Sequence, residues 1–317
     1  MNKISFPGLG IDEFTVNETA FLGIKWYGLI ICIGMIVAVS YIYFRTKKQK
    51  LLLDDLLELA LFTIPLGVLG ARLYYVFTDN GNGSLFSQIM SNTNLNFGEK
   101  LIELINLRNG GLAIYGGIIA GLLTVFFVCR YKKINLLKFL DATGPAVMIA
   151  QAIGRWGNFF NAEAYGSKTD LPWRMGLLPN MDSNVTMYYY HPTFLYESLW
   201  NVLGFILINV FYKKKKFDGQ SFLSYIAWYG LGRAFIELLR TDSLWIFNHT
   251  IRVSTLVGGL SFVASVGVMI WLFIKNKDRE LSPVIYYENA KHHPNNLKTE
   301  EENKESTDTE NIPEENN

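Results

Sequence analysis

An arginine at position 155 lies near the end of a long apolar stretch, in the segment Gly154–Gly166. At about 100° per residue, Gln151, Arg155, Asn158 and Ala162 share one helical face. A guanidinium inside a bilayer costs several kcal/mol, so it must face a partner or a wet cavity. Two interpretations stay open for Arg155. It binds an anionic headgroup, or it pairs with an acid and locks helices together.

A second polar stripe occurs in a later apolar stretch. Tyr229, Arg233, Glu237 and Arg240 follow i, i+4, i+8 and i+11 spacing, which predicts one helical face. Arg233 and Glu237 are spaced to pair along the helix, which leaves a surplus arginine. Guanidinium forks suit phosphate oxygens. The two stripes together therefore predict a phosphate-binding cavity within the bilayer, with a structural ion-pair network as the alternative.

Two smaller motifs accompany these stripes. His191-Pro192 precedes Tyr196-Glu197 at the start of an apolar run, where proline suits a first helical turn. Glu197 is the expected partner for one of the arginines. The segment Asn109–Gly117 surrounds Tyr115 with glycine pairs, which predict close helix packing in preference to a hollow for a headgroup.

The elements that must position these residues are apolar runs near the length of about 20 residues that crosses a bilayer. Lipid cannot satisfy the backbone of an open strand, so the runs are expected to be helices. The sequence predicts an all-α polytopic membrane protein with seven spans: Trp26–Phe44, Leu56–Thr78, Leu112–Cys129, Leu140–Phe160, Thr193–Phe211, Gln220–Leu239 and Val253–Ile274.

Basic residues predict the orientation of these spans. They cluster after the first, third, fifth and seventh runs, at Arg45 to Lys48, Arg130 to Lys133, Lys213 to Lys216, and Lys275 to Arg279. The other connections contain few basic residues. These are Lys100, Arg108, Lys168, Arg174 and Arg252. Because positive residues stay on the cytoplasmic side, the N-terminus is expected outside and the C-terminus inside.

The segments between the spans divide the rest of the chain. The two long outward connections, 79–111 and 162–192, are expected to form an extracytoplasmic cap of loops with short ordered pieces. Residues 1–275 are predicted to form the membrane domain. Residues 276–317 are rich in Glu, Asn and Thr and are expected to be a disordered cytoplasmic tail.

Composition narrows the function. Half of the 317 residues are hydrophobic and 18% are charged, against about 25% in a soluble domain. The net charge of +1 gives no reason to expect nucleic acid as a partner. Cys32 and Cys129 lie in apolar runs, and the four histidines lack metal-site spacing, so we expect neither metal nor cofactor. The mixed, polar first 25 residues do not resemble a cleavable targeting segment.

The segment Gly154–Gly166 resembles the signature of prolipoprotein diacylglyceryl transferases. The resemblance covers most of residues 20–275. It includes these further motifs: Trp26-Tyr27-Gly28, Gly70-Ala71-Arg72, the glycines around Tyr115, His191-Pro192, Tyr196-Glu197, and Tyr229-Gly230 with Arg233 and Glu237.

The resemblance implies a reaction in the bacterial cell membrane. The lipobox cysteine in the signal peptide of a prolipoprotein attacks phosphatidylglycerol, a thioether forms and glycerol phosphate leaves. It implies that Arg155 and Arg233 contact the lipid phosphate, with Tyr229 and Tyr115 as further catalytic residues. The other implied binding residues are Asn158, Asn161, Glu163, Gly166, Tyr27, Glu237, Arg72, His191 and Glu197.

One position departs from the family pattern. Many members carry histidine where this chain has Tyr115, and a phenol with a pKa near 10 is a poor base at neutral pH. We therefore expect Tyr115 only to position groups, and thiolate formation to depend on another residue or on the field of the arginines. The rival interpretations are a lipid or anion transporter, which lacks support from any two-half symmetry of the spans, and a structural scaffold.

Overall fold

The computed structural model describes residues 2–20, 23–47, 51–78, 83–106, 111–178, 187–243, 245–246 and 250–276. Several predictions made from the sequence lie outside these residues: the basic residues Lys48, Arg108, Lys277 and Arg279, the Asn109-Gly110 pair, and the tail beyond Asn276. The chain forms two compact units. The first comprises Met1–Thr46 and Leu137–Pro283, and the second comprises Lys47–Leu136 and Val284–Asn317.

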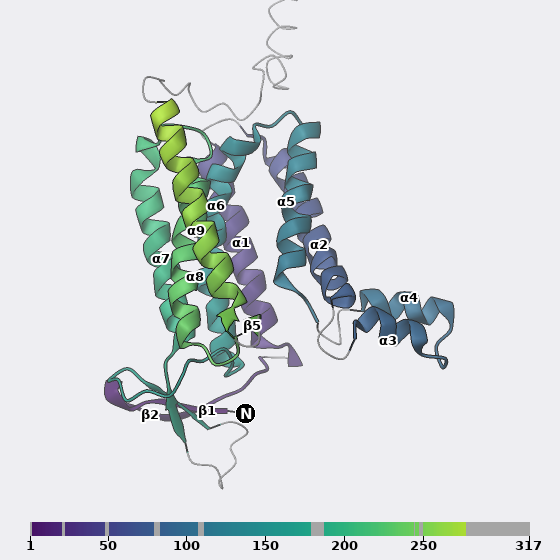
Figure 1. The fold of residues 1–317 in the computed structure, drawn as a ribbon, viewed down its shortest axis with the longest axis vertical. Helices are drawn as coiled ribbons and strands as arrows, with labels where there is room; N and C mark the ends of the chain where they lie inside the picture. The colour runs from purple at the N-terminus through teal and green to yellow at the C-terminus, as the bar shows by residue number, and fades with distance from the viewer. Residues whose placement is uncertain are drawn as a thin grey trace, which may run out of the picture. The chain divides into compact units, whose positions relative to one another are not determined.

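The first unit contains five long helices that run alongside one another (Figure 1). They are α1 (Trp26–Lys47), α6 (Leu136–Phe160), α7 (Thr193–Phe211), α8 (Gln220–Ile236) and α9 (Val253–Lys275). Two short 3₁₀ turns extend α7 and α8, namely η4 (Tyr212–Lys214) and η5 (Glu237–Leu239).

Small residues let these helices approach closely. A Cβ added at Gly230 of α8 would lie 2.6 Å from the carbonyl oxygen of Gly258 in α9, and the reverse distance is the same. Trp200 of α7 and Trp228 of α8 stack with ring centroids 4.3 Å apart. Each indole N–H donates to the other residue's carbonyl oxygen, at 2.9 and 2.8 Å. Because both indole N–H groups find partners inside the bundle, α7 and α8 are joined without an unsatisfied donor.

The start of α8 is held by a buried carboxylate from α6. Asp141 is fully buried, and it accepts backbone N–H donors from Gly219, Ser221 and Phe222 at 2.9, 2.7 and 3.2 Å. Lys215 adds an ion pair at 2.9 Å. The first N–H groups of a helix lack partners within it, so Asp141 supplies the cap that α8 does not provide for itself.

A four-stranded antiparallel sheet adjoins the bundle in the first unit. Its order is β2-β1-β3-β4, with β1 at Asn2–Phe6, β2 at Ile11–Val16, β3 at Met175–Leu178 and β4 at Tyr188–Tyr190. Ile4, Val16, Met175 and Leu177 form a buried core with Phe194 of α7. This core packs against Phe159 and Phe160 at the end of α6. The N-terminal strands β1 and β2 therefore join β3 and β4 in one sheet at the end of the bundle. A short hairpin, β5 (Trp245–Ile246) and β6 (Ile251–Arg252), precedes α9.

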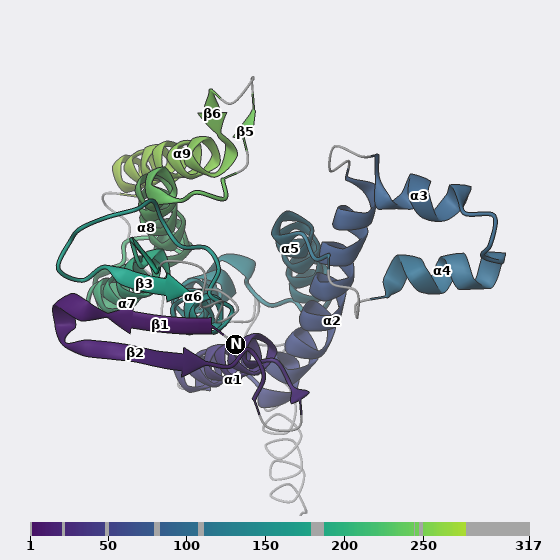
Figure 2. The same cartoon turned by 90° about the horizontal axis from the view of Figure 1, so that it is seen from below.

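The second unit is built on α2 (Leu53–Phe77) and α5 (Ile114–Tyr131), which pack through facing glycines. Added Cβ atoms at Gly70 and Gly116 would each collide with the backbone or side chains of the other helix. Gly117 lies against Gly67 in the same contact. The expectation that glycines around Tyr115 serve packing is therefore confirmed. Between these helices the chain forms α3 (Leu85–Ser91) and α4 (Phe97–Ile105), side by side in Figure 2.

Most of the described chain is helical, as predicted. Within the described residues, six helices are long and apolar enough to cross a membrane: α1, α2, α5, α6, α7 with η4, and α9. The sixth predicted run, Gln220–Leu239, is shorter as an α-helix, because α8 ends at Ile236 after 17 residues and continues as η5.

Candidate functional site

Arg155 lies five residues before the end of α6 and points at a carboxylate on α7. Its Nη2 is 2.5 Å from Oε2 of Glu197. Its Nη1 donates to Oδ1 of Asn158, one turn later on the same helix, at 3.3 Å. The sequence prediction that Glu197 partners an arginine is therefore confirmed.

Glu197 contacts three guanidinium groups. Its Oε1 accepts from Nη1 of Arg233 at 3.1 Å and from Nη1 of Arg240 at 3.4 Å, while Oε2 faces Arg155. A single carboxylate on α7 thus joins the arginine of α6 to the arginine of α8. The predicted convergence of the two arginines on one place is confirmed.

Arg233 has acidic partners on two elements. Its Nη2 lies 2.8 Å from Oε2 of Glu237, the i, i+4 pair expected from the sequence, and 3.4 Å from Oγ of Ser254 at the start of α9. The carbonyl oxygen of Glu237 also accepts a hydrogen bond from Nη1 of Arg252. Helices α7, α8 and α9 therefore all contribute to the surroundings of Arg233.

Arg240 differs from the prediction. It follows η5 with an extended backbone, so it does not continue the helical face of Tyr229 and Arg233. It is not a surplus charge either, since its Nε and Nη2 bind both carboxylate oxygens of Asp242 at 2.9 and 2.7 Å. Burial alone would raise the pKa of Asp242, but this double contact with Arg240 lowers it below its usual value. Arg240 therefore anchors the loop after α8.

The acidic and basic side chains of this cluster differ in solvent exposure. The side chains of Glu197 and Glu237 are 4% and 2% exposed, whereas those of Arg155 and Arg233 are 20% and 19% exposed. The carboxylates thus lie beneath the guanidinium groups, which present the accessible surface. Exposed guanidinium groups in fixed positions have the donor geometry that suits the oxygens of a phosphate or carboxylate.

The segment after Arg155 leaves the helix and turns back across the site. Because α6 ends at Phe160, Ala162 does not share the helical face predicted for it, and it adopts a left-handed φ of 50°. Glu163 accepts from the amides of Asn158 and Asn161 at 3.0 and 3.2 Å. The three polar side chains of this signature segment therefore form one connected group beside Arg155.

Gly166 occupies a position where a side chain does not fit. An added Cβ would lie 2.7 Å from Cβ of His191 and 3.0 Å from the carbonyl oxygen of Leu239. The Gly166 N–H donates to the His191 carbonyl oxygen at 2.9 Å, and Gly166 also forms a bridge with Arg240. This glycine lets the signature segment, the start of α7 and the end of α8 meet.

His191 is held by neighbouring polar groups. Its Nδ1 lies 3.2 Å from the hydroxyl of Tyr196, which also accepts from Nε1 of Trp173 at 2.7 Å. Burial lowers the pKa of His191 below its ordinary value, so the imidazole is neutral at neutral pH. A neutral imidazole donates a hydrogen bond from one nitrogen and accepts one at the other, and Tyr196 occupies Nδ1.

The predicted tyrosines lie at different places. Tyr27 of α1 packs against Gly157 of α6, where an added Cβ would lie 2.7 Å from its ring. Tyr229 of α8 stacks on Tyr225 with centroids 6.0 Å apart. Tyr115 lies in the second unit, at the start of α5, with its ring centroid 6.5 Å from that of Tyr74.

Arg72 also lies in the second unit, where it is almost fully buried. Its guanidinium donates to the carbonyl oxygens of Glu103, Leu104 and Gly111 at 3.0, 3.0 and 3.3 Å. These contacts hold the end of α4 against α2.

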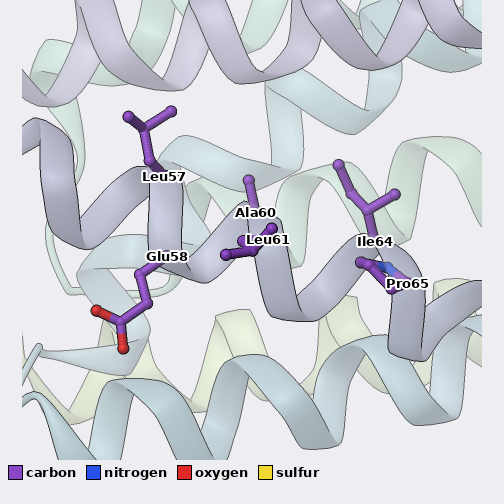
Figure 3. Close-up of a pocket in the computed structure, with 6 residues that line it drawn as sticks. All are labelled: Leu57, Glu58, Ala60, Leu61, Ile64 and Pro65. Atoms are coloured by element: carbon purple, nitrogen blue, oxygen red, sulfur yellow. The ribbon is translucent and has the colours of Figure 1, made fainter.

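Two apolar hollows border α2 in the second unit. One of about 530 Å³ follows α2 and is lined by Leu57, Glu58, Ala60, Leu61, Ile64 and Pro65 (Figure 3). The other, of about 460 Å³, includes residues of α5. Apart from Glu58, the residues along the hollow in Figure 3 are apolar, which suits hydrocarbon contact and offers no chemistry comparable to the arginine cluster.

Known proteins are similar to this sequence over most of its length. Residues 16–271 match the family model described as prolipoprotein diacylglyceryl transferase. The chain belongs to this family. With its apolar helices, family membership makes it an integral membrane protein.

Individual relatives agree with that assignment. The phosphatidylglycerol–prolipoprotein diacylglyceryl transferase of Enterococcus faecalis is 43% identical over 267 residues, covering 80% of this chain and 90% of that protein. The Listeria welshimeri enzyme is 40% identical, with 84% and 90% covered. The Clostridioides difficile enzyme is 37% identical, with 88% and 98% covered.

Sequence reasoning missed several participants in the cluster. Asp242, Arg252 and Ser254 all contact it, although they lie beyond the predicted helical stripe. Asp242 lies two residues after Arg240, and this close spacing of opposite charges is a local pattern that indicates an ion pair. Arg252 and Ser254 reach the site only because α9 begins beside the end of α8, which no local pattern indicates.

Proposed function

We propose that this protein transfers the diacylglyceryl group of phosphatidylglycerol to the lipobox cysteine in the signal peptide of a prolipoprotein. The thiolate sulfur attacks the glyceryl carbon that carries the phosphate ester. A carbon–sulfur bond forms as the carbon–oxygen bond breaks, and glycerol phosphate leaves with the electron pair. The names of the relatives specify both substrate classes, phosphatidylglycerol and prolipoprotein.

The observation that carries the proposal is the layering of charge at Glu197. Arg155 and Arg233 come from different helices, share one buried carboxylate and keep partly exposed guanidinium groups. The leaving group is a phosphate monoester whose negative charge grows in the transition state. Donors already fixed in place stabilise such charge without reorganisation, so these two arginines are assigned the lipid phosphate.

Other residues of the first unit have supporting roles in this proposal. Asn158, Asn161, Glu163 and Gly166 shape the edge of the phosphate pocket, and Tyr27 and Tyr229 line it. Glu197 and Glu237 orient the arginines, and His191 supports the signature segment from the start of α7. The assignments of Arg72 as a binding residue and Tyr115 as a catalytic residue stay predictions, because both lie in the second unit.

The acceptor thiol must lose a proton before it attacks, since the thiolate is the nucleophile. Positive surroundings lower a thiol pKa, and the exposed guanidinium groups provide such surroundings. We therefore assign thiolate stabilisation to the arginine field. Phosphate binding and thiol activation then depend on the same cluster.

The proposed topology places the protein in the bacterial cell membrane with seven spans. α8 with η5 is the seventh, next to the six that satisfy length and hydropathy. The N-terminus lies outside and the C-terminus in the cytoplasm, in accord with the basic residues. The four-stranded sheet belongs to the extracytoplasmic cap. Residues 1–275 form the transferase domain, and residues 276–317 form a cytoplasmic tail without a catalytic part.

The test supplies phosphatidylglycerol and a lipobox peptide to the purified protein in detergent. We expect the peptide to gain a diacylglyceryl group, detected by mass spectrometry, and a peptide with serine in place of the cysteine to stay unmodified. Arg155→Ala and Arg233→Ala should each lose about 10²–10³-fold in turnover, the usual cost of removing one transition-state donor. Both variants should still insert into membranes.

Two results would reject the proposal. One is unmodified peptide with wild-type protein while intact lipid crosses vesicle membranes, which indicates a transporter. The other is wild-type turnover in both arginine variants, which removes the arginines from the phosphate site.

A further inference from the structure

Helix α4 in the second unit exposes an apolar face. Phe97 and Ile102 are 73% and 66% exposed, Leu101 and Ile105 are also exposed, and no residue of α4 is buried in the part of the chain that the structure describes. At about 100° per residue these four apolar side chains fall within an arc of about 140°. The charged residues of α4, which are Glu99, Lys100 and Glu103, occupy the opposite side.

This helix is nevertheless firmly built. Asn96 and Glu99 form a reciprocal capping box, with N–H to oxygen distances of 2.9 and 2.8 Å. Lys100 donates to the carbonyl oxygen of Met90 in α3 at 2.8 Å. A capped helix with one apolar face that other described residues leave uncovered is suited to an apolar surface outside the chain.

The depth of α4 is fixed by α2. Arg72 donates from Nε and Nη2 to the carbonyl oxygens of Leu104 and Glu103, the last turn of α4. Arg72 stands five residues before the end of α2 at Phe77, which is about 7.5 Å along the helix axis. The end of α4 is thus held level with the last turns of a candidate membrane span. Figure 1 shows α3 and α4 extending sideways from that end of α2.

The same level carries aromatic side chains typical of a membrane boundary. Phe77 packs on Phe86 of α3 with ring centroids 4.9 Å apart, and Tyr74 lies beside Tyr115. Tyrosine and tryptophan are enriched where hydrocarbon meets headgroups, which fits Tyr74 and Tyr115 at this level. The chain enters α3 from one candidate span, α2, and leaves α4 into another, α5.

Because α3 and α4 connect two candidate spans, we propose that α4 lies in the headgroup region of the bilayer that α2 and α5 cross. Its apolar side chains then face the acyl chains, namely Phe97, Leu101, Ile102 and Ile105. Arg72 sets its depth. The occupant of the exposed apolar face is therefore lipid. This surface includes no residue of the arginine cluster, and the proposal does not depend on the proposed reaction.

The charges of α4 indicate which interaction would attach it to the bilayer. Two glutamates and one lysine give no excess of positive charge, unlike the basic amphipathic helices that seek anionic lipid. Attachment by apolar burial alone should be independent of salt and should occur on neutral phosphatidylcholine.

The test uses the full chain with Cys32 and Cys129 replaced by serine and a single cysteine at position 102 or 99. Each is labelled with a polarity-sensitive fluorophore and reconstituted into phosphatidylcholine vesicles. Position 99 is the matched control, because it is exposed on the charged side of the same helix, and its backbone N–H still donates to the Asn96 cap when the Glu99 side chain is replaced. We expect lipid carrying a nitroxide near the headgroup to quench position 102 strongly and a water-soluble quencher to act mainly on position 99.

Two outcomes overturn the proposal. Equal quenching of both positions by the water-soluble quencher places α4 in water. Protection of position 102 that disappears when the protein is diluted to one copy per vesicle identifies a second copy as the occupant. Quenching by the shallow nitroxide that persists on dilution and at high salt supports the bilayer.

A second measurement tests Arg72. Arg72→Met removes the donors to the end of α4, so the label at position 102 should lose its preference for the shallow nitroxide over one placed deep in the acyl chain. An unchanged preference would remove Arg72 from the depth-setting role. If this variant does not fold, the comparison of positions 102 and 99 still decides where α4 lies.

Discussion

Glu197 shows how one residue organises the site. It is almost fully buried and contacts Arg155, Arg233 and Arg240, so its desolvation is offset by three cationic partners. The sequence identified Glu197, Arg155 and Arg233 because charged residues are rare in apolar runs. It did not identify the sharing of one carboxylate by three arginines, since that depends on how α6, α7 and the end of α8 approach one another.

Arg233→Lys tests the geometry of the guanidinium. Arg233 reaches Glu197 through Nη1 and Glu237 through Nη2, and a single ammonium does not reproduce that fork. We expect turnover to fall by about tenfold or more, because a hydrogen bond to a charged group contributes about 1.5–3 kcal/mol. Peptide lipidation rates measure the effect. Unaltered kinetics would reduce the role of Arg233 to bulk charge.

Tyr115→Phe tests the position where many family members carry histidine. The substitution removes only the hydroxyl, so a positioning role predicts a loss far smaller than the about 10²–10⁴-fold contributed by a general base. The readout is turnover, with lipid binding and thermal stability as controls. Abolished turnover with both controls intact would make the Tyr115 hydroxyl essential and contradict the assignment of thiol activation to the arginine field.

At the scale of elements, the apolar runs predicted the long helices well. The strands were missed, because β1 pairs with β3, which lies about 170 residues further along the chain, and no local period records that pairing. The end of α8 was also missed. Its last turn becomes η5, where the Glu237 carbonyl oxygen accepts from Arg252 and the Arg240 guanidinium reaches Glu197.

The close contact between α8 and α9 predicts different effects for alanine substitutions at two adjacent glycines of α9, Gly258 and Gly259. An added Cβ at Gly258 would lie 2.6 Å from the carbonyl oxygen of Gly230 and 3.5 Å from Cβ of Arg233. Gly258→Ala should therefore lower stability by about 1–3 kcal/mol and reduce turnover. Gly259→Ala is the control, since no described atom lies within 4 Å of its Cβ. Thermal unfolding in detergent compares the two, and equal effects would contradict the predicted close approach.

At the scale of the whole molecule, the first unit contains both the arginine cluster and the sheet at its end. The signature segment links them, since Gly166 contacts His191 and Arg240 while Ala162 and Tyr165 pack on the sheet core. The segment 162–192 was predicted to form loops with short ordered pieces. In its described part β3 pairs with the N-terminal strand β1, so the sheet was not predictable from this segment alone.

This connection predicts a pH dependence of stability. Burial lowers the pKa of His191 in the folded state, so the unfolded chain binds its proton more readily. Stability should therefore decrease as the pH falls from 7 through the unfolded value of about 6.5. Thermal unfolding at pH 7 and pH 5 measures the decrease, which should be smaller in His191→Gln. The other three histidines are present in both proteins, so a decrease of equal size would contradict the prediction.

The cap that Asp141 provides for α8 has a consequence at the opposite end of the same helices. Arg155 stands fourteen residues after Asp141, and Arg233 stands twelve after Ser221, so each arginine is about 20 Å from this anchor. Tied at both ends, α6 and α8 resist sliding along their axes. A thinner or thicker bilayer should then tilt the two helices together and leave the spacing of their guanidinium groups unchanged. Such constancy suits an enzyme whose lipid substrate is part of the bilayer around it.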